Sequence, residues 1–355
     1  MNPASSNFTD LTARLESGVS LTPPEVELAA DYLLSEEGDA DLKADFLRSL
    51  AKKGETVEEI AGFVQAFLRR AVDPGLVPEA MPGPMIDVCG TGGDRLDLFN
   101  VSTTSMFVLA AGGARVVKHG NRSVTSQCGG ADVLETLGIR IDLPPPELRR
   151  CVETHGCGFL FAPHYHPAFR VIAPVRKALA GEGIATIFNL LGPLLNPARP
   201  GHQLVGIFSE AALPKYAGVL QRLGRRHAWA VHGCASNGAG MDEISTMGAT
   251  QVHAVQRGAF QSSVLDLELL KGLGLSPATL ADLRGGTRED NAAILLGILD
   301  GSIQGPKREK VALNAAAGFV VADLAESLEA GLALALEQLD SGKALAKLRA
   351  LQGFR

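Results

Sequence analysis

The chain has 355 residues, of which 46% are hydrophobic and 20% are charged. These values are close to those of globular proteins, so the composition excludes a disordered or fibrous chain, and the length favours two domains. The net charge of −6 argues against general binding to nucleic acid, because proteins that bind long polyanions usually carry a basic field. Glycine is unusually frequent, with 40 residues. This predicts close packing between helices and strands and backbone that approaches ligands.

The cysteines and the hydropathy pattern bear on the compartment. The five cysteines form no CxxC pair and no zinc-like spacing, which favours small buried residues in a reducing compartment. They are Cys89, Cys128, Cys151, Cys157 and Cys234. The sequence has no N-terminal targeting pattern and no apolar run of about 18 residues, so we expect a cytoplasmic protein with no membrane partner.

Residues 1–75 are predicted to be helical. Thr22 followed by Pro23 is a helix start signal, because threonine caps a helix and proline fits its first position. Further helices are expected over 41–52, ending at Gly54, and over 58–71, where apolar residues form one stripe.

A Pro- and Gly-rich segment, residues 73–84, follows these helices. Such segments often separate domains, so we expect a small helical domain over 1–78 and a large α/β domain over 79–355. The segment 177–197 is also broken by glycine and proline, and it could be a crossover between the domains.

Short apolar segments alternate with helical segments in the larger domain. Strands are expected over 85–89, 114–118, 139–143, 159–162, 204–208 and 227–232, and helices over 102–111, 131–137, 144–156 and 213–223. The chain after residue 291 is expected to be mostly helical. This alternation predicts an α/β fold with a mainly parallel central sheet, whose ligands bind at the carboxyl ends of the strands.

The segment Gly90-Thr91-Gly92-Gly93-Asp94 lies between a predicted strand and a predicted helix. Its glycines let backbone N–H groups wrap an anion, and the helix N-terminus adds a favourable dipole. The helix opens with Asn100-Val101-Ser102-Thr103, whose amide and hydroxyls can bind phosphate or a phosphate-bound metal. The segment is neither GxGxxG nor a Walker motif, and a structural turn with an N-cap is the alternative.

A second polar loop, Lys118-His119-Gly120-Asn121-Arg122, follows the next predicted strand. It concentrates positive charge in an acidic protein, which suits a local anionic ligand. Hydroxyl donors continue to Ser126, and Gly130 lies at the start of the following helix. A solvated loop would explain the charges but not the adjacent glycines and hydroxyls.

Asp242 and Glu243 lie in a loop after another predicted strand. Adjacent carboxylates can hold Mg²⁺, which prefers oxygen ligands and bridges to phosphates, although many surface turns carry such a pair. His164 and His166 are also ambiguous, since they could bind a metal but have no third ligand nearby. Arg176 could pair with a carboxylate ligand.

Together these segments resemble the anthranilate phosphoribosyltransferase family. The matching motifs are GTGGD (90–94), FNVST (99–103), KHGNR (118–122), FAPHYHPA (161–168), PVR (174–176), TIFNLLGPLLNP (186–197) and DEIS (242–245). The resemblance covers roughly residues 10–350, with the motifs in the family's order.

The resemblance implies an enzyme of tryptophan biosynthesis, which transfers phosphoribose from phosphoribosyl pyrophosphate (PRPP) to the amine of anthranilate and releases pyrophosphate. It implies a pair of Mg²⁺ ions in each active site and no covalent nucleophile. It also implies a fold similar to pyrimidine nucleoside phosphorylases, with residues 174–197 returning the chain to the small domain, and a homodimer formed through the N-terminal helices.

The family's site residues fall into three groups when they are carried over by position. The PRPP-binding group is Gly90, Gly93, Asp94, Asn100, Val101, Ser102, Thr103, Lys118, His119, Gly120, Asn121, Arg122, Ser126 and Gly130. The anthranilate-binding group is Gly90, His119, Asn121, His166, Arg176 and Pro193, and the metal ligands are Ser102, Asp242 and Glu243.

The sequence departs from the common family pattern at a few positions. Arg95, Leu98, Cys128 and Ala185 stand where Gly, Thr, Ser and Arg are common. Leu98 has no hydroxyl to offer PRPP, whereas Arg95 could supply a charge. Two other functions remain open, a nucleoside phosphorylase of the same fold and a non-catalytic relative that binds nucleic acid, although the retained motifs and the net charge argue against them.

Overall fold

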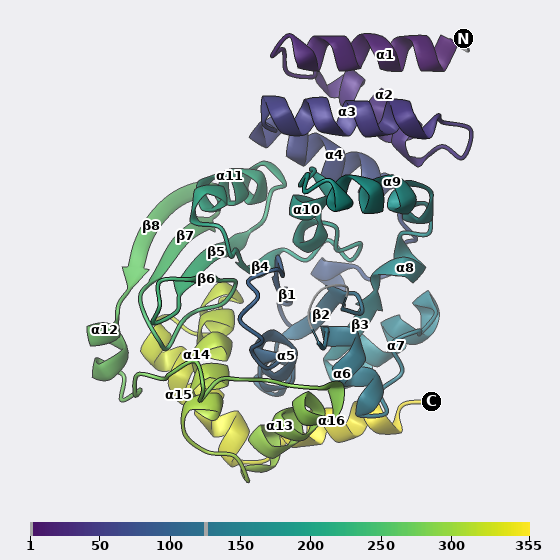
Figure 1. Ribbon diagram of the computed structural model, residues 1–355. Helices are drawn as coiled ribbons and strands as arrows, with labels where there is room; N and C mark the ends of the chain where they lie inside the picture. Colours follow the sequence, from purple (N-terminus) through teal and green to yellow (C-terminus); the bar gives the residue numbers. More distant parts are fainter. Residues whose placement is uncertain (1–2, 124–126) are drawn as a thin grey trace.

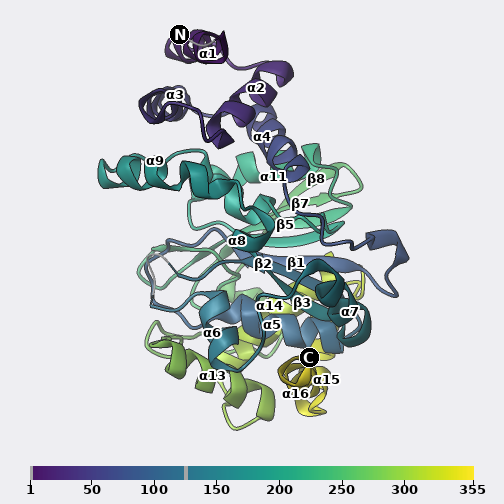
Figure 2. The ribbon, with the colours of Figure 1, turned by 90° about the vertical axis from the view of Figure 1, so that its right-hand side faces the viewer.

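The computed structural model describes residues 3–123 and 127–355 of the chain. Helices at the N-terminal end stand on a larger α/β part built around one eight-stranded sheet, and the two termini lie at opposite ends of the molecule (Figures 1 and 2). This arrangement confirms the predicted α/β fold with a helical N-terminal part.

The N-terminal helices begin and end close to the predicted residues. They are α1 (Pro3–Glu16), α2 (Pro23–Leu34), α3 (Ala40–Lys53) and α4 (Val57–Arg69). Thr22 caps α2, and its N–H donates to Glu25 Oε2 at 2.7 Å. Gly54 ends α3 with a φ of 84°, which glycine adopts without the steric cost of a side chain.

Residues 169–194 pack against these helices. They form α9 (Phe169–Gly181), α10 (Phe188–Leu191) and the 3-10 turn η2 (Gly192–Leu194). The ring of Phe67 on α4 lies 5.2 Å from that of Phe169 and 5.6 Å from that of Phe188, measured between centroids. The division of the chain at residue 78 stays a prediction.

The sheet has the order β3-β2-β1-β4-β5-β7-β8, with β6 paired to β5. Its strands are β1 (Met85–Gly90), β2 (Arg115–Gly120), β3 (Cys157–Phe161), β4 (His202–Gly206), β5 (His227–Cys234), β6 (Gly240–Met241), β7 (Thr250–Gln256) and β8 (Ala259–Leu265). The first five strands in this order are parallel, and β6, β7 and β8 are antiparallel to their neighbours. The prediction of a mainly parallel sheet is therefore confirmed.

Two features of the sheet differ from the sequence analysis. The strand expected over 139–143 is wrong, because these residues are an irregular link between α6 (Gly130–Thr136) and α7 (Pro145–His155). Ile139, Ile141 and Leu143 are buried, so their alternation reflects one-sided burial without strand pairing. The β7–β8 hairpin had not been predicted.

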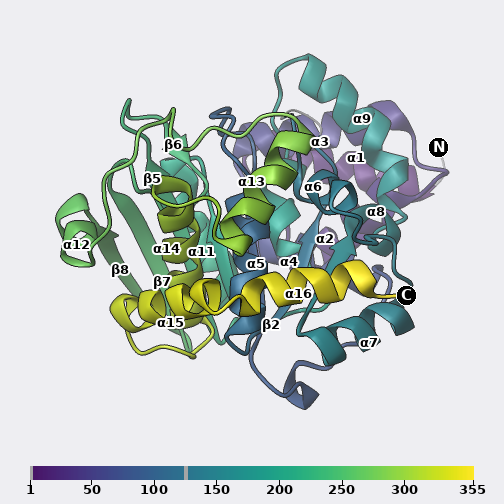
Figure 3. The same cartoon turned by 90° about the horizontal axis from the view of Figure 1, so that it is seen from below.

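Helices cover both faces of the sheet. On one face lies α11 (Leu213–Arg222), where Val205 and Ala230 join the core of the N-terminal helices. On the other face lie α5 (Val101–Ala111) and α14 (Pro306–Val321), where Leu204 and Val231 belong to a second core (Figure 3). Neighbouring residues fall into different cores because side chains alternate along a strand. The remaining elements are η1 (Pro78–Ala80), α8 (Ala162–Tyr165), η3 (Glu210–Ala212), α12 (Leu267–Gly272), α13 (Arg288–Asp300), α15 (Leu328–Asp340) and α16 (Lys343–Gly353).

Candidate active site

Three neighbouring parallel strands end in glycine at the same edge of the sheet. Gly90 ends β1, Gly120 ends β2 and Gly206 ends β4, and β1 pairs with both of the others. The segment 90–94 begins at Gly90, and the segment 118–122 comprises the last residues of β2 and the start of the loop after Gly120. The structure therefore brings both predicted anion-binding loops to the carboxyl edge of the sheet, where α/β proteins bind ligands.

The acidic residues Asp242 and Glu243 lie directly against this edge. A Cβ added at Gly206 would lie 1.6 Å from the Asp242 carbonyl oxygen, and one at Gly90 would lie 2.2 Å from Asp242 Oδ2. At Gly233, near the end of β5, an added Cβ would lie 2.3 Å from the Glu243 carbonyl oxygen. Since no side chain fits at these distances, the glycines are what allow the acidic segment to approach the strands.

The glycine loop after β1 contacts the acidic pair. Gly92 and Gly93 have φ values of 70° and 88°, and the Gly92 N–H donates to Asp242 Oδ2 at 2.6 Å. Asp94 accepts from the Leu96 N–H at 3.2 Å, and burial raises the pKa of the Asp94 carboxyl. The loop therefore presents its glycine backbone to a carboxylate of the protein.

Lys118 joins the second loop to the same place. Its Nζ donates to the Val88 carbonyl at 2.6 Å and to Ser102 Oγ at 3.0 Å, so it ties β2 to β1 and to the first turn of α5. Burial lowers the pKa of Lys118, although Asp87 and the acidic pair favour its charged form. Ser102, Asp242 and Glu243 line one small pocket at this edge.

The acidic pair suits a hard cation. Glu243 Oε2 is buried with no hydrogen-bond partner, and its nearest opposite charge is Lys310 Nζ at 3.5 Å. Burial raises the pKa of Asp242 to about 6 and that of Glu243 to about 8. The charge of Asp94 raises both pKa values further, and the charge of Asp242 adds to the rise at Glu243. The described residues hold no cluster of three or more His, Cys, Asp or Glu that could bind a metal. Mg²⁺ fits such a partial set, because it keeps waters and takes phosphate oxygens as further ligands.

Arg122 and Asn121, which follow β2, are less buried than Lys118. Arg122 pairs with Glu135 at 2.7 Å and lies over the Phe161 ring at 4.6 Å, so its charge already has a partner. Asn121 is exposed, and its Oδ1 accepts from the Arg122 N–H. The predicted PRPP contact Ser126 lies outside the described residues.

Gly130 and the start of α5 complete the predicted PRPP group. A Cβ at Gly130 would lie 3.1 Å from Thr103 Oγ1, so α6 packs closely on α5. Val101 and Thr103 are buried, whereas Asn100 donates to the Cys128 carbonyl at 3.2 Å and keeps a buried Oδ1 without a partner. Asn100 is therefore a second polar group at the site with unused hydrogen-bonding capacity.

His119, His166, Arg176 and Pro193 of the predicted anthranilate group gather beside the N-terminal helices, whereas Gly90 lies against Asp242 and Asn121 is exposed in the loop after β2. The rings of His119 and His166 meet edge to face at 5.4 Å, and His166 Nε2 lies 2.8 Å from the Leu195 carbonyl. Burial lowers the pKa of both histidines, that of His119 to about 3, so both are neutral at pH 7. Arg176 lies over the Phe188 ring at 4.9 Å and has no carboxylate partner among the described residues, and Pro193 is buried.

Several buried polar residues around the site were missed by sequence reasoning. They are Asp87, Asn196, Gln203, Arg225, Lys310 and Asn314. Asn196 donates to Asp87 at 2.9 Å, and Gln203 donates to the Pro193 carbonyl at 2.5 Å. A carboxylate within an apolar strand could have drawn attention to Asp87, whereas Lys310 and Asn314 carry no signal beyond their spacing of one helical turn.

Two of the sequence departures have a structural consequence. Arg95 has a φ of 57°, which glycine adopts at little cost but arginine does not. Leu98 forms a bridge with Arg284, which fastens the glycine loop to the segment before α13. The loop is thus held by backbone contacts at the position where the family commonly has threonine.

The fold and the site define a glycosyl transferase. The helical bundle domain model of the glycosyl transferase family matches residues 9–71, and the a/b domain model of that family matches residues 82–345. An anthranilate phosphoribosyltransferase from Moorella thermoacetica is 43% identical over 340 residues, which cover 96% of each chain. The chain therefore belongs to the anthranilate phosphoribosyltransferase family, as its motifs had indicated.

Solved structures agree with this assignment. The anthranilate phosphoribosyltransferase from Thermus thermophilus has a TM-score of 0.87 and 39% identity, with 97% of this chain and 99% of that chain covered. The Saccharomyces cerevisiae enzyme in complex with PRPP and Mg has a TM-score of 0.83 and 26% identity, with 98% and 97% covered. Within the described residues, no helix is both long and apolar enough to cross a membrane.

Proposed function

We propose that the chain transfers the phosphoribosyl group of PRPP to the amine of anthranilate and releases pyrophosphate, as a Mg²⁺-dependent step of tryptophan biosynthesis. The observation that carries this proposal is the buried Glu243 Oε2, which has an ion pair with Lys310 at 3.5 Å but accepts no hydrogen bond. Glu243 shares a pocket with Asp242 and Ser102 at the carboxyl edge of the sheet. Names of relatives at 41–43% identity support the same activity.

Ser102, Asp242 and Glu243 would hold Mg²⁺, and we propose a pair of ions in each site. The metal, when bound, would offset negative charge on the pyrophosphate group. Lys118 adds a buried positive charge at the same place, and the N–H groups of the glycine loop and of the α5 N-terminus add dipoles. The remaining predicted PRPP contacts, from Gly90 to Gly130, would orient the ribose and the phosphates.

The acceptor needs orientation more than activation. The amine of anthranilate is neutral at pH 7, so the site requires no strong base to create the nucleophile. Arg176 lacks a carboxylate partner among the described residues and could pair with the carboxylate of anthranilate, while neutral His119 and His166 flank the ring. We assign no nucleophilic role to Cys128, and burial, which raises the pKa of its thiol to about 11, supports this.

The alternatives are not favoured. A nucleoside phosphorylase or a nucleic-acid-binding relative would leave the match to anthranilate phosphoribosyltransferases over almost the whole chain unexplained. We also propose a homodimer through the N-terminal helices and a cytoplasmic location, with PRPP and anthranilate as the partners.

A fluorescence assay tests the proposed function. The purified protein, with PRPP and Mg²⁺, is expected to consume anthranilate and to release pyrophosphate, and chelation of Mg²⁺ is expected to stop the reaction. The Thermus thermophilus enzyme serves as the reference. If the reference consumes anthranilate and this protein does not, the proposal is wrong, and release of a nucleobase that depends on free phosphate would favour the phosphorylase.

A further inference from the structure

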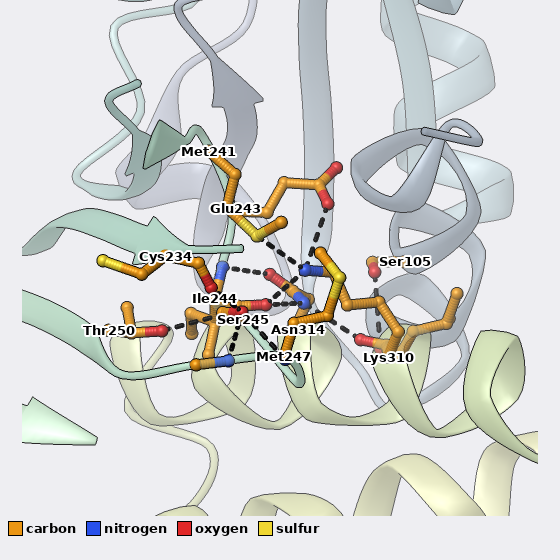
Figure 4. A network of polar contacts seen from close by, with 12 residues as sticks. Ser105, Cys234, Met241, Glu243, Ile244, Ser245, Met247, Thr250, Lys310 and Asn314 are labelled. Atoms are coloured by element: carbon orange, nitrogen blue, oxygen red, sulfur yellow. Dashed lines mark hydrogen bonds and ion pairs between the residues drawn. The ribbon is translucent and has the colours of Figure 1, made fainter. Parts of the chain in front are cut away.

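Helix α14 holds the residue that directly follows the acidic pair. The Ile244 N–H donates to Asn314 Oδ1 at 3.1 Å, and Asn314 Nδ2 donates back to the Ile244 carbonyl at 3.1 Å. Lys310, one turn earlier on the helix, donates to the same carbonyl at 2.7 Å (Figure 4). Both backbone groups of Ile244 are therefore held by side chains from one helix.

The hydrogen bonds between Ile244 and α14 are buried, and the next residue of the chain, Ser245, is also held by hydrogen bonds. Lys310 and Ile244 have no exposed surface, and Asn314 is 5% exposed. The next residue, Ser245, donates from its Oγ to the Cys234 carbonyl at 2.6 Å, and its N–H donates to Thr250 Oγ1 at 2.8 Å. The chain after the acidic pair is thus fixed by hydrogen bonds that make no use of the carboxylates.

The sheet limits the acidic pair from the other side. The close approach of Gly90, Gly206 and Gly233 leaves no space for the segment to move towards the strands. The acidic pair is therefore held between the strand ends and α14, and its position does not depend on a bound ligand. The Lys310 ammonium, 3.5 Å from Glu243 Oε2, supplies a counter-charge that is itself fixed by Ile244.

We propose that Asn314 and Lys310 are positioning residues that place the Asp242–Glu243 carboxylates and thereby set the affinity for the divalent cation. The proposal rests on the proposed function. Neither residue belongs to the PRPP, anthranilate or metal groups named above. Both hold the backbone of Ile244, Lys310 also pairs directly with Glu243, and Asn314 also lines the small pocket. Removal of residues that support metal ligands typically weakens metal binding by about 10–100-fold.

The test measures metal binding directly. Asn314→Ala is expected to weaken Mn²⁺ binding in the presence of PRPP by about tenfold or more, measured from the electron paramagnetic resonance signal of free Mn²⁺. The Mg²⁺ concentration for half-maximal turnover should rise by a similar factor, with the KM for anthranilate unchanged. Asn314→Asp, which keeps the acceptor for the Ile244 N–H, is the second variant if Asn314→Ala does not fold.

Gln338→Ala is the matched control. Gln338 is also a buried amide, 3% exposed on α15, but it donates within its own helix to the Leu334 carbonyl. It should retain wild-type Mn²⁺ binding. Wild-type Mn²⁺ binding in folded Asn314→Ala, or an equal loss in Gln338→Ala, would overturn the positioning role. A wild-type protein that binds Mn²⁺ with PRPP but leaves anthranilate unchanged would instead refute the proposed function alone.

Discussion

Two buried glutamates with lysine partners occupy opposite parts of this molecule and differ in how they are satisfied. In the helical part, Glu59 accepts from the Leu21 N–H, the Thr56 N–H and Lys53 Nζ at 2.8–2.9 Å. At the edge of the sheet, Glu243 lies 3.5 Å from Lys310, and its Oε2 accepts no hydrogen bond. Both side chains are largely buried, with none of Glu59 and 15% of Glu243 exposed.

The difference in hydrogen bonding indicates that Glu59 belongs to a structural ion pair and that Glu243 is a ligand-binding group. A buried carboxylate is costly unless donors surround it, and Glu59 has these donors within the protein. Glu243 keeps unused acceptor capacity in a pocket, so a cation or another ligand can supply what the protein does not. Burial alone therefore does not distinguish the two roles, whereas the partners of each oxygen do.

Removal of one partner of the buried Glu59–Lys53 pair should give the largest effect. Glu59→Gln leaves Lys53 buried without its counter-charge, and the loss of a partner from a buried pair costs about 3–5 kcal/mol. Urea denaturation should show this loss, while turnover per folded molecule stays at the wild-type value. A loss well below about 1 kcal/mol, as for an exposed pair, would mean that the Glu59 network is not structural.

Substitution of the acidic pair at the edge of the sheet is expected to affect turnover more than stability. Asp242→Asn combined with Glu243→Gln should reduce turnover by about 10²–10³-fold, because the site loses its charge stabilisation. Stability should fall less than in Glu59→Gln: buried Lys310 loses its partner at 3.5 Å, but the change also removes the repulsion of Asp242 on Glu243. Turnover is measured across a Mg²⁺ titration, and wild-type turnover at limiting Mg²⁺ would refute the metal assignment.

Stabilisation by ligands should depend on Glu243 but not on Glu59. Mg²⁺ with PRPP, each at about 100 times its dissociation constant, should stabilise the protein by about 2.7 kcal/mol or more. Glu59→Gln should gain the same unfolding free energy on ligand addition as the wild type, although it is less stable without ligands. Glu243→Gln should lose most of this gain. Thermal denaturation with and without the ligands provides the measurement. If both variants gained the same stability from the ligands, Glu243 would not be a ligand-binding group distinct from the structural Glu59.

The local part of this comparison was visible in the sequence. Thr22-Pro23 predicted a helix start, and Gly54 predicted a helix end, because capping depends on a few adjacent residues. The segments 90–94 and 118–122 each follow a predicted strand, and ligands were predicted at the carboxyl ends of the strands, because such ends lie together in a parallel sheet.

The long-range part was not visible. Asp242 and Glu243 alone looked like an ordinary surface turn, and only the family resemblance marked them as metal ligands. Their burial depends on three strand-end glycines and on Lys310 and Asn314 from a helix more than 60 residues later. Likewise, the spacing of Ile139, Ile141 and Leu143 could not distinguish a strand from an irregular buried link.

The smallest expected effect tests a related motif that lies at the surface. Thr22 and Glu25 cap α2 as Thr56 and Glu59 cap α4, but Glu25 is partly exposed. The Thr22 N–H holds the pKa of Glu25 below its usual value of 4.5, against the opposing effect of burial. Glu25→Gln should therefore destabilise the protein by only about 0.5–1 kcal/mol near pH 7.

The pH dependence of that difference has a defined sign. A lowered carboxyl pKa stabilises the folded state above pH 4.5, and this contribution is lost as the pH falls through the folded-state pKa. The stability gap between the wild type and Glu25→Gln should be full at neutral pH and should close below pH 4.5, measured by urea denaturation at each pH. Asp10→Asn, on the exposed surface of α1, is the control. A gap that persists unchanged below the folded-state pKa would mean that Glu25 contributes through packing. Closure of the gap would show that even a partly exposed capping carboxylate acts through its charge.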